Sequence, residues 1–187
     1  YLRGRGIGKG EILKWKMGYC SKGKYGGRVI IPSFNNDGSC NYFIARSYVG
    51  HSRRYLNPPC GRDIIFNELN IDWDEPVIIV EGVYDAIVAG DNAIPILGST
   101  LREDSKLFQA IAIHDTPVYI ALDPDAEKKA QWMIRSLKKY DLEIKKLNIG
   151  SYEDIGSMSP EVFQGKLKTA EDVDDDLYWL EKQLRNL

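Results

Sequence analysis

The sequence predicts an α/β protein in which a parallel sheet is flanked by helices and preceded by a small, basic, mixed α/β lobe. From about residue 63, short apolar runs alternate with helical patterns, which is typical of a parallel sheet. The preceding segment is rich in glycine and patterned as short strands, and the two parts carry opposite charges. With 187 residues, 43% of them hydrophobic, the chain has enough apolar material for one ordinary domain or two small ones.

The first lobe, residues 1–62, is expected to contain a β-hairpin. Residues 28–32 (RVIIP) have the composition of a strand ended by its proline. Residues 35–38 (NNDG) are a strong turn signal, and residues 41–46 form the returning strand. Two successive prolines within residues 56–59 predict that an irregular segment closes the lobe.

The next part of the chain, residues 63–150, is expected to form the sheet domain. Four short apolar segments are predicted as strands: residues 76–80, 93–98, 117–122 and 144–147. Helical patterns lie between them, over residues 85–89, 101–112 and 126–140. Strands that are apolar on both faces are typical of a sheet covered by helices on both sides.

The last part, residues 151–187, is expected to be an acidic helical segment that packs on the core. Ser159 is a favourable N-cap, and Pro160 suits the first helical position. A closing helix is predicted from apolar residues that share one face: Val173, Leu177, Leu180 and Leu184. Residues 174–176 (DDD) would point in different directions on that helix, so we interpret them as a solvated helix start and not as a metal cluster.

Composition excludes several classes of protein. No apolar run approaches the ~20 residues of a membrane span, so no membrane association is expected. Residues 1–6 do not form a signal peptide, and the missing initiating Met indicates a fragment of a longer protein. Cys20, Cys40 and Cys60 are odd in number and far apart, which predicts neither a disulfide framework nor a zinc site. A reducing, cytoplasmic setting is therefore expected.

The net charge of -2 conceals an opposition between the two parts of the chain. Residues 1–62 carry 12 Lys and Arg against 2 Asp and Glu, whereas the remainder carries 13 Lys and Arg against 25 Asp and Glu. A basic lobe is suited to a phosphate backbone, and an acidic part is suited to metal ions. Two ordinary solvated surfaces would have the same composition, so charge alone leaves both interpretations open.

Acidic residues directly follow two of the predicted strands. Glu81 follows the first strand of the sheet, and Asp123 and Asp125 follow the third. The carboxyl ends of parallel strands form a ligand crevice, so the three carboxylates converge if these strands are neighbours. Crowded carboxylates favour Mg²⁺ or Mn²⁺, and such a site suits phosphoryl or nucleotidyl transfer. Helix capping is the alternative interpretation for Asp125 and, with more weight, for Asp85.

Two motifs resemble those of the TOPRIM domain. Residues 80–86 (VEGVYDA) resemble its first motif, and residues 122–126 (LDPDA) resemble its Asp-x-Asp motif. Upstream segments resemble, in order, the amino-terminal subdomain of the DnaG-like primase core: residues 1–7, 17–19, 27–32, 45–46 and 54–57. The resemblance covers about residues 1–155, and the ordered series is more specific than any single piece.

The resemblance implies which residues act. The family's catalytic, metal-binding Glu and Asp pair correspond to Glu81, Asp123 and Asp125. Further metal-side residues correspond to Asp85, the second acid of the first motif, and to Asp154. The residues implied in nucleotide or template binding are basic: Arg28, Arg46, Arg53 and Arg54.

The implied function is that of a DNA primase catalytic core, a DNA-directed RNA polymerase. It would make short RNA primers on a single-stranded DNA template from ribonucleoside triphosphates, with Mg²⁺ or Mn²⁺. A basic residue that the family places after residues 54–57 has no clear match in residues 64–68. The family's zinc module and helicase-binding domain are not recognisable, so a replicative helicase would be reached through a region outside this chain. The compact form resembles phage- or plasmid-encoded members in a bacterial cell.

Two other functions stay open. A TOPRIM nuclease or topoisomerase fragment would use the same metals to break strands, but no tyrosine has the context of a nucleophile, and Tyr84 is interpreted as packing. A non-catalytic single-strand-binding or replication docking module would keep the basic lobe with a degenerate acidic site. The complete acidic set argues against the latter.

Overall fold

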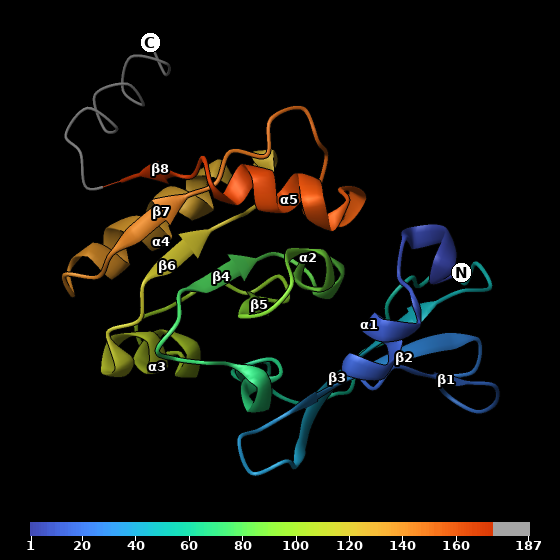
Figure 1. Ribbon diagram of the computed structural model, residues 1–187. Coiled ribbons are helices and arrows are strands. Elements are labelled where there is room, and N and C mark those ends of the chain that lie inside the picture. Colours follow the sequence, from blue (N-terminus) through green and yellow to red (C-terminus); the bar gives the residue numbers. More distant parts are fainter. Residues whose placement is uncertain (174–187) are drawn as a thin grey trace. The chain divides into compact units, whose positions relative to one another are not determined.

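The computed structural model describes residues 1–173 and contains two compact units, Tyr1–Asn70 and a second that begins at Ile71 (Figure 1). The division therefore lies later than the change of sequence style near residue 62. Phe66 is buried in the first unit with its ring centre 6.4 Å from that of Trp15. Because this core includes Phe66, the residues just after position 62 belong to the first unit.

The first unit is built on a three-stranded antiparallel sheet in the order β1-β2-β3. The strands are β1 (Gly18–Cys20), β2 (Arg28–Phe34) and β3 (Cys40–Ser47), and α1 (Lys9–Lys14) precedes them, with short 3-10 turns at η1 (Arg3–Arg5) and η2 (Glu68–Asn70). The predicted β2–β3 hairpin is confirmed. Its turn is closed by the N–H of Gly38, which donates to the carbonyl of Asn35 at 2.9 Å.

The prediction that Pro32 ends its strand is wrong. Strand β2 continues to Phe34, and Pro32 pairs with Phe43 of β3. Strand β1 pairs only with the first part of β2, Arg28–Ile30. Beyond Ile30, β2 is therefore an edge strand, which is a position where a proline is tolerated.

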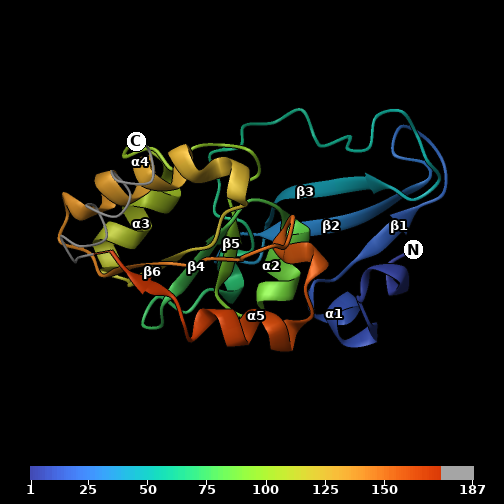
Figure 2. The same ribbon diagram turned by 90° about the horizontal axis from the view of Figure 1, so that it is seen from above.

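The second unit contains a five-stranded sheet in the order β5-β4-β6-β7-β8. Its four parallel strands confirm the predicted ones and are shorter: β4 (Val77–Val80), β5 (Ala93–Pro95), β6 (Val118–Ile120) and β7 (Ile144–Lys146). The fifth, β8 (Glu171–Asp172), is antiparallel to β7 and was not predicted. Figure 2 shows helices on both faces of this sheet: α2 (Val83–Ala89) with α5 (Pro160–Leu167), and α3 (Lys106–His114) with α4 (Glu127–Lys138).

The connections between the strands place a switch point at the centre of this sheet. From β4 the chain passes through α2 to β5 on one side, whereas from β6 it passes through α4 to β7 on the other. Strands β4 and β6 are hydrogen-bonded neighbours. In open parallel sheets, ligands bind beyond the carboxyl ends of the two strands at such a point.

Local signals in the sequence account for the ends of several helices. The hydroxyl of Ser159 accepts the N–H of Val162 at 3.3 Å, which confirms the predicted N-cap of α5. Helix α4 follows a 3-10 turn, η3 (Pro124–Ala126), and another, η4 (Ile155–Ser157), precedes α5. Val173 is buried, but the rest of the predicted closing helix and the acidic run at 174–176 lie outside the described residues. No helix within residues 1–173 is both long and apolar enough to cross a membrane.

Candidate metal centre

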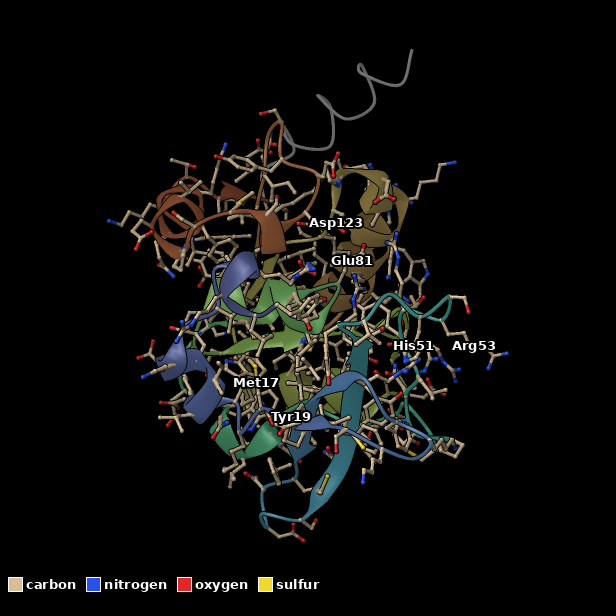
Figure 3. The ribbon with its side chains drawn as sticks, turned by 90° about the vertical axis from the view of Figure 1, so that its right-hand side faces the viewer. Met17, Tyr19, His51, Arg53, Glu81 and Asp123 are labelled. Carbon is tan, nitrogen blue, oxygen red and sulfur yellow. The ribbon has the colours of Figure 1, made fainter. Side chains whose placement is uncertain are left out.

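Three acidic side chains meet beyond the carboxyl ends of β4 and β6. Glu81 directly follows β4, Asp123 lies just after β6, and Asp125 lies within η3. One carboxylate oxygen from each of the three lies within 4.8 Å of the others. Figure 3 shows Glu81 and Asp123 at this edge of the second unit. The parallel register of the two strands thus brings together residues that are about forty positions apart in the sequence.

The donor set fits a hard divalent cation. Glu81 Oε1 and Asp123 Oδ1 are buried and have no hydrogen-bond partner within the described part of the chain. Buried charged oxygens without partners are costly unless a cation compensates them. Carboxylate oxygens are the ligands that Mg²⁺ and Mn²⁺ prefer. The fit therefore rests on unsatisfied atoms as well as on residue type.

The electrostatics of Asp123 follow from this crowding. Burial, together with the negative charges of Asp85, Glu81, Asp154 and Asp125, raises the pKa of Asp123 to about 7. Without a cation, the Asp123 carboxyl is therefore only partly ionised near pH 7. A divalent cation would favour the carboxylate and displace that proton.

The two further acids predicted for the site lie next to it but outside the group of three. Asp85 is buried and its two oxygens accept backbone N–H groups, from Gly82 at 2.8 Å and from Gly156 at 2.9 Å. Burial raises the pKa of the Asp85 carboxyl, and these two hydrogen bonds oppose the rise. Asp154 precedes η4 as its N-cap residue, without a side-chain cap bond. It acts on Asp123 and Asp85 through its charge.

The four basic residues predicted in the first unit have different surroundings. Arg28 is only 5% exposed, and its guanidinium donates to the carbonyl of Arg53 at 2.9 Å and to that of Gly26 at 3.4 Å. Arg46 lies 4.6 Å from the ring centre of Tyr55, and its Nε donates to the Tyr1 hydroxyl at 3.1 Å. The side chains of Arg53 and Arg54 are exposed.

The loop that carries Arg53 packs against the start of β2. Gly27 adopts a φ of 69°, and a Cβ at this position would lie 2.7 Å from a methyl group of Val49. His51 Nε2 lies 3.2 Å from the carbonyl oxygen of Gly26. Figure 3 shows His51 and Arg53 together on this loop, with Met17 and Tyr19 on the segment that forms β1. The buried Arg28 side chain and the close packing at Gly27 together fix the loop that carries the exposed Arg53 and Arg54.

No protein-family model and no curated protein matches the chain. Solved structures do match. A DnaG primase catalytic domain bound to ssDNA has a TM-score of 0.80 at 18% identity, over 100% of this chain and 75% of that one. The Aquifex aeolicus primase zinc-binding and RNA polymerase domains have a TM-score of 0.74 at 20% identity, over 92% and 55%. The E. coli primase catalytic core has a TM-score of 0.67 at 17% identity, over 100% and 68%.

The chain has the fold of a DnaG-like primase catalytic core. This similarity confirms the predicted architecture of a parallel-rich, helix-flanked sheet preceded by a small lobe. At these identities it establishes the fold alone. The chain spans about half the length of the Aquifex aeolicus structure, at 55%.

A lysine at the acidic site was missed by the sequence analysis. Lys129 Nζ lies 4.0 Å from Glu81 Oε2, and both side chains are partly buried. Lys129 is in the first turn of α4, where the helix dipole disfavours a cation. A lysine in this unfavourable position, four residues after the Asp-x-Asp motif, was the feature of the sequence that could have indicated a contact with the acidic site.

A pocket of about 230 Å³ lies beside Asp123, on the side of β7. Its polar lining includes Glu127, Lys146 and Asn148. Lys146 and Glu127 form an ion pair, which removes most of the net charge that either would bring. The pocket thus provides space next to Asp123 that water or a substrate group can enter.

Proposed function

We propose that this chain is the catalytic core of a DNA primase that synthesises short RNA primers on single-stranded DNA by metal-dependent nucleotidyl transfer. The observation that carries the proposal is the group formed by Glu81, Asp123 and Asp125, whose oxygens lie within 4.8 Å of one another in a DnaG-like fold. Three adjacent carboxylates, two of which have a buried oxygen without a hydrogen-bond partner among the described residues, are unusual unless they serve a functional site.

The acidic residues would hold the metal. Glu81 and Asp123 offer buried oxygens without partners, and Asp125 offers an exposed carboxylate. Asp154 adds negative charge from the loop after β7. When bound, Mg²⁺ or Mn²⁺ would stabilise negative charge on the phosphate oxygens of a nucleoside triphosphate. Asp123 must release its proton at this stage, and Lys129, 4.0 Å from Glu81 Oε2, would compete with the cation for that carboxylate.

The first unit would bind the template. Its excess of Lys and Arg suits a phosphate backbone. Arg46 and Tyr55 form a cation–π pair whose half-exposed ring offers a base a stacking surface. Arg53 and Arg54 would contact phosphates, and Arg28 would hold the loop that presents them. A neighbouring structure is a catalytic domain bound to ssDNA, which supports this assignment of the ligand.

The remaining partners follow from the same reaction. Ribonucleoside triphosphates and the growing RNA primer would be its substrates, with the primer 3′-hydroxyl attacking the α-phosphate and pyrophosphate leaving. Catalysis would rest on positioning and charge stabilisation by the acidic site. A replicative helicase would be a further partner.

Primer synthesis on single-stranded DNA tests the proposal. The assay supplies labelled ribonucleoside triphosphates with Mg²⁺ or Mn²⁺ and compares the wild type with Glu81→Gln and Asp123→Ala. Glu143→Gln is the matched control, because this acid of the same unit is exposed and forms an ion pair with Lys145. We expect the site variants to lose primer synthesis and the control to retain it. Full activity in either site variant would refute the assigned site.

A second measurement separates this function from strand breakage. The same proteins are incubated with supercoiled DNA and Mn²⁺, without nucleotides. We expect no nicking that depends on Asp123. Nicking that disappears in Asp123→Ala, with no primer synthesis by the wild type, would favour a TOPRIM nuclease or topoisomerase fragment.

A further inference from the structure

Asp85 connects two segments of the second unit that lie far apart in the sequence. Its Oδ2 accepts the N–H of Gly82 at 2.8 Å, at the start of α2. Its Oδ1 accepts the N–H of Gly156 at 2.9 Å, inside η4 and 71 residues away. One buried carboxylate thus joins the starts of two helical turns.

Each of these two amides is adjacent to an acid of the candidate site. Gly82 directly follows Glu81, and Gly156 lies two residues after Asp154. The hydrogen bonds of Asp85 therefore fix the backbone that carries Glu81 relative to the backbone that carries Asp154. Strand β6, which leads to Asp123, is already held against β4 by the parallel ladder.

Gly156 is shaped for this contact. A Cβ at position 156 would lie 3.1 Å from Asp85 Oδ1 and 3.5 Å from the Cβ of Tyr84. It would also lie 3.6 Å from Asp154 Oδ1. A larger residue would crowd Asp85 Oδ1 by a few tenths of an ångström, so glycine at position 156 favours the close approach of the amide.

We propose that Asp85 is a positioning residue, which places Asp154 beside Glu81 and Asp123 through the amide of Gly156. This inference rests on the proposed metal-dependent function and deepens it. Asp85 is 8% exposed and both of its oxygens are engaged, while Glu81 and Asp123 each keep a buried oxygen without a partner. The open ligand positions are thus at the group of three, and Asp85 supports the chain around them.

The inference is tested by titrating the full chain with Mn²⁺ and measuring the free Mn²⁺ by electron paramagnetic resonance. Asp85→Asn keeps the shape of the side chain, but its NH₂ group cannot accept a hydrogen bond. One of the two backbone N–H groups that Asp85 binds therefore loses its acceptor. Gly156→Ala leaves Asp85 intact and crowds the same contact. We expect each variant to weaken Mn²⁺ affinity about 10- to 100-fold, the range for outer residues that orient metal ligands, with the number of bound ions unchanged.

Gly165→Ala is the matched control for Gly156→Ala. Gly165 lies in α5 of the same unit, and a Cβ there would meet nothing within 4 Å. We expect its Mn²⁺ affinity to stay within about twofold of the wild type, as expected for independent sites. If Asp85→Asn does not fold, Gly156→Ala still carries the test.

The Asp154→Ala background separates positioning from a general loss of structure. If Asp85 acts by placing Asp154, Asp85→Asn has little further effect on Mn²⁺ affinity once Asp154 is removed. An equally large loss in both backgrounds would overturn the inference. So would one fewer bound ion in Asp85→Asn alone, because Asp85 would then be a ligand itself.

Failure of the proposed function gives a different result. If Glu81→Gln and Asp123→Ala leave Mn²⁺ affinity unchanged, the metal centre itself is wrong. If they weaken it while Asp85→Asn and Gly156→Ala do not, the centre stands and the positioning role of Asp85 is refuted.

Discussion

The acidic residues of the second unit and the basic residues of the first differ in how the fold uses them. Glu81, Asp123 and Asp125 converge, because each follows a strand of one parallel sheet. The predicted arginines do not share one environment: Arg28 is buried against the backbone, and Arg46 stacks on Tyr55.

The difference shows where the position of a residue in the sequence determines which side chains surround it, and where it does not. A residue at the end of a parallel strand has its direction set by the ladder, so its partners can be inferred from the strand order. The surroundings of a residue beside a glycine-rich loop, such as Arg28, depend instead on which backbone carbonyls the loop brings near it. Two arginines of one lobe therefore have different surroundings: Arg28 donates to the backbone, whereas Arg46 stacks on an aromatic ring.

The largest expected effect contrasts two acids at opposite ends of the same sheet. Asp125→Ala removes a member of the group of three, and we expect primer synthesis to fall about 100-fold or more, as when a group that stabilises transition-state charge is lost. Asp91→Ala alters a pocket that lies near the amino ends of the strands, and activity should stay within about twofold. Equal losses in both variants would mean that acidity in general, and not the convergent site, matters.

The next prediction contrasts two arginines of the first unit. Arg28→Ala leaves the carbonyl of Arg53 without its donor, so we expect the free energy of unfolding to fall by about 2–3 kcal/mol in denaturant titrations. Arg54→Ala should change stability by less than about 0.5 kcal/mol, because this side chain is exposed. It should instead weaken template binding and reduce its salt dependence. A stable Arg28→Ala protein would contradict the structural role.

The pKa of Asp123 predicts opposite effects of pH on metal binding and on stability. The pKa is raised from 3.8 to about 7, so the folded state binds more protons than the unfolded state between these values. Stability of the metal-free protein should therefore fall as pH rises through this window and level off above about 7. Mn²⁺ affinity should rise over the same range, because the cation replaces the proton.

Asp123→Asn is the control for that prediction. It removes the titrating group, so metal-free stability at pH 8 should increase by about 1 kcal/mol after allowance for partial exposure to solvent. Thermal unfolding at pH 5 and pH 8, with and without Mn²⁺, measures both effects. A wild-type protein whose metal-free stability rises from pH 5 to pH 8, while that of Asp123→Asn does not, would contradict the sign.

The smallest expected effect concerns the cation inside the acidic site. Lys129→Gln removes a positive charge 4.0 Å from Glu81 Oε2, so Mn²⁺ affinity should rise about threefold, as for a partly screened ion pair. Lys128→Gln is the matched control, because Lys128 precedes Lys129 in the sequence and its side chain is exposed. It should change the Mn²⁺ affinity less. A weaker Mn²⁺ affinity in Lys129→Gln would mean that Lys129 orients Glu81 for the metal more than it competes with it.

The sequence by itself determined the architecture and the group of three acids. Apolar runs covered on both faces predicted the parallel strands, and Glu81 and Asp123 at their ends predicted convergence, because side-chain direction at a strand end follows from the ladder. Ser159 and Pro160 likewise predicted the start of α5 from local hydrogen bonding alone.

Only the tertiary structure decided the roles that depend on which distant backbone groups come near. Nothing in the motif around Asp85 reveals that its second oxygen accepts the N–H of Gly156, 71 residues away. The burial of Arg28 and the proximity of Lys129 to Glu81 depend in the same way on how loops and helices pack. Strand continuation through Pro32 also required knowing that β1 pairs only with Arg28–Ile30 of β2. Periodicity encodes contacts within an element and along a ladder, whereas contacts between elements are set when the chain packs.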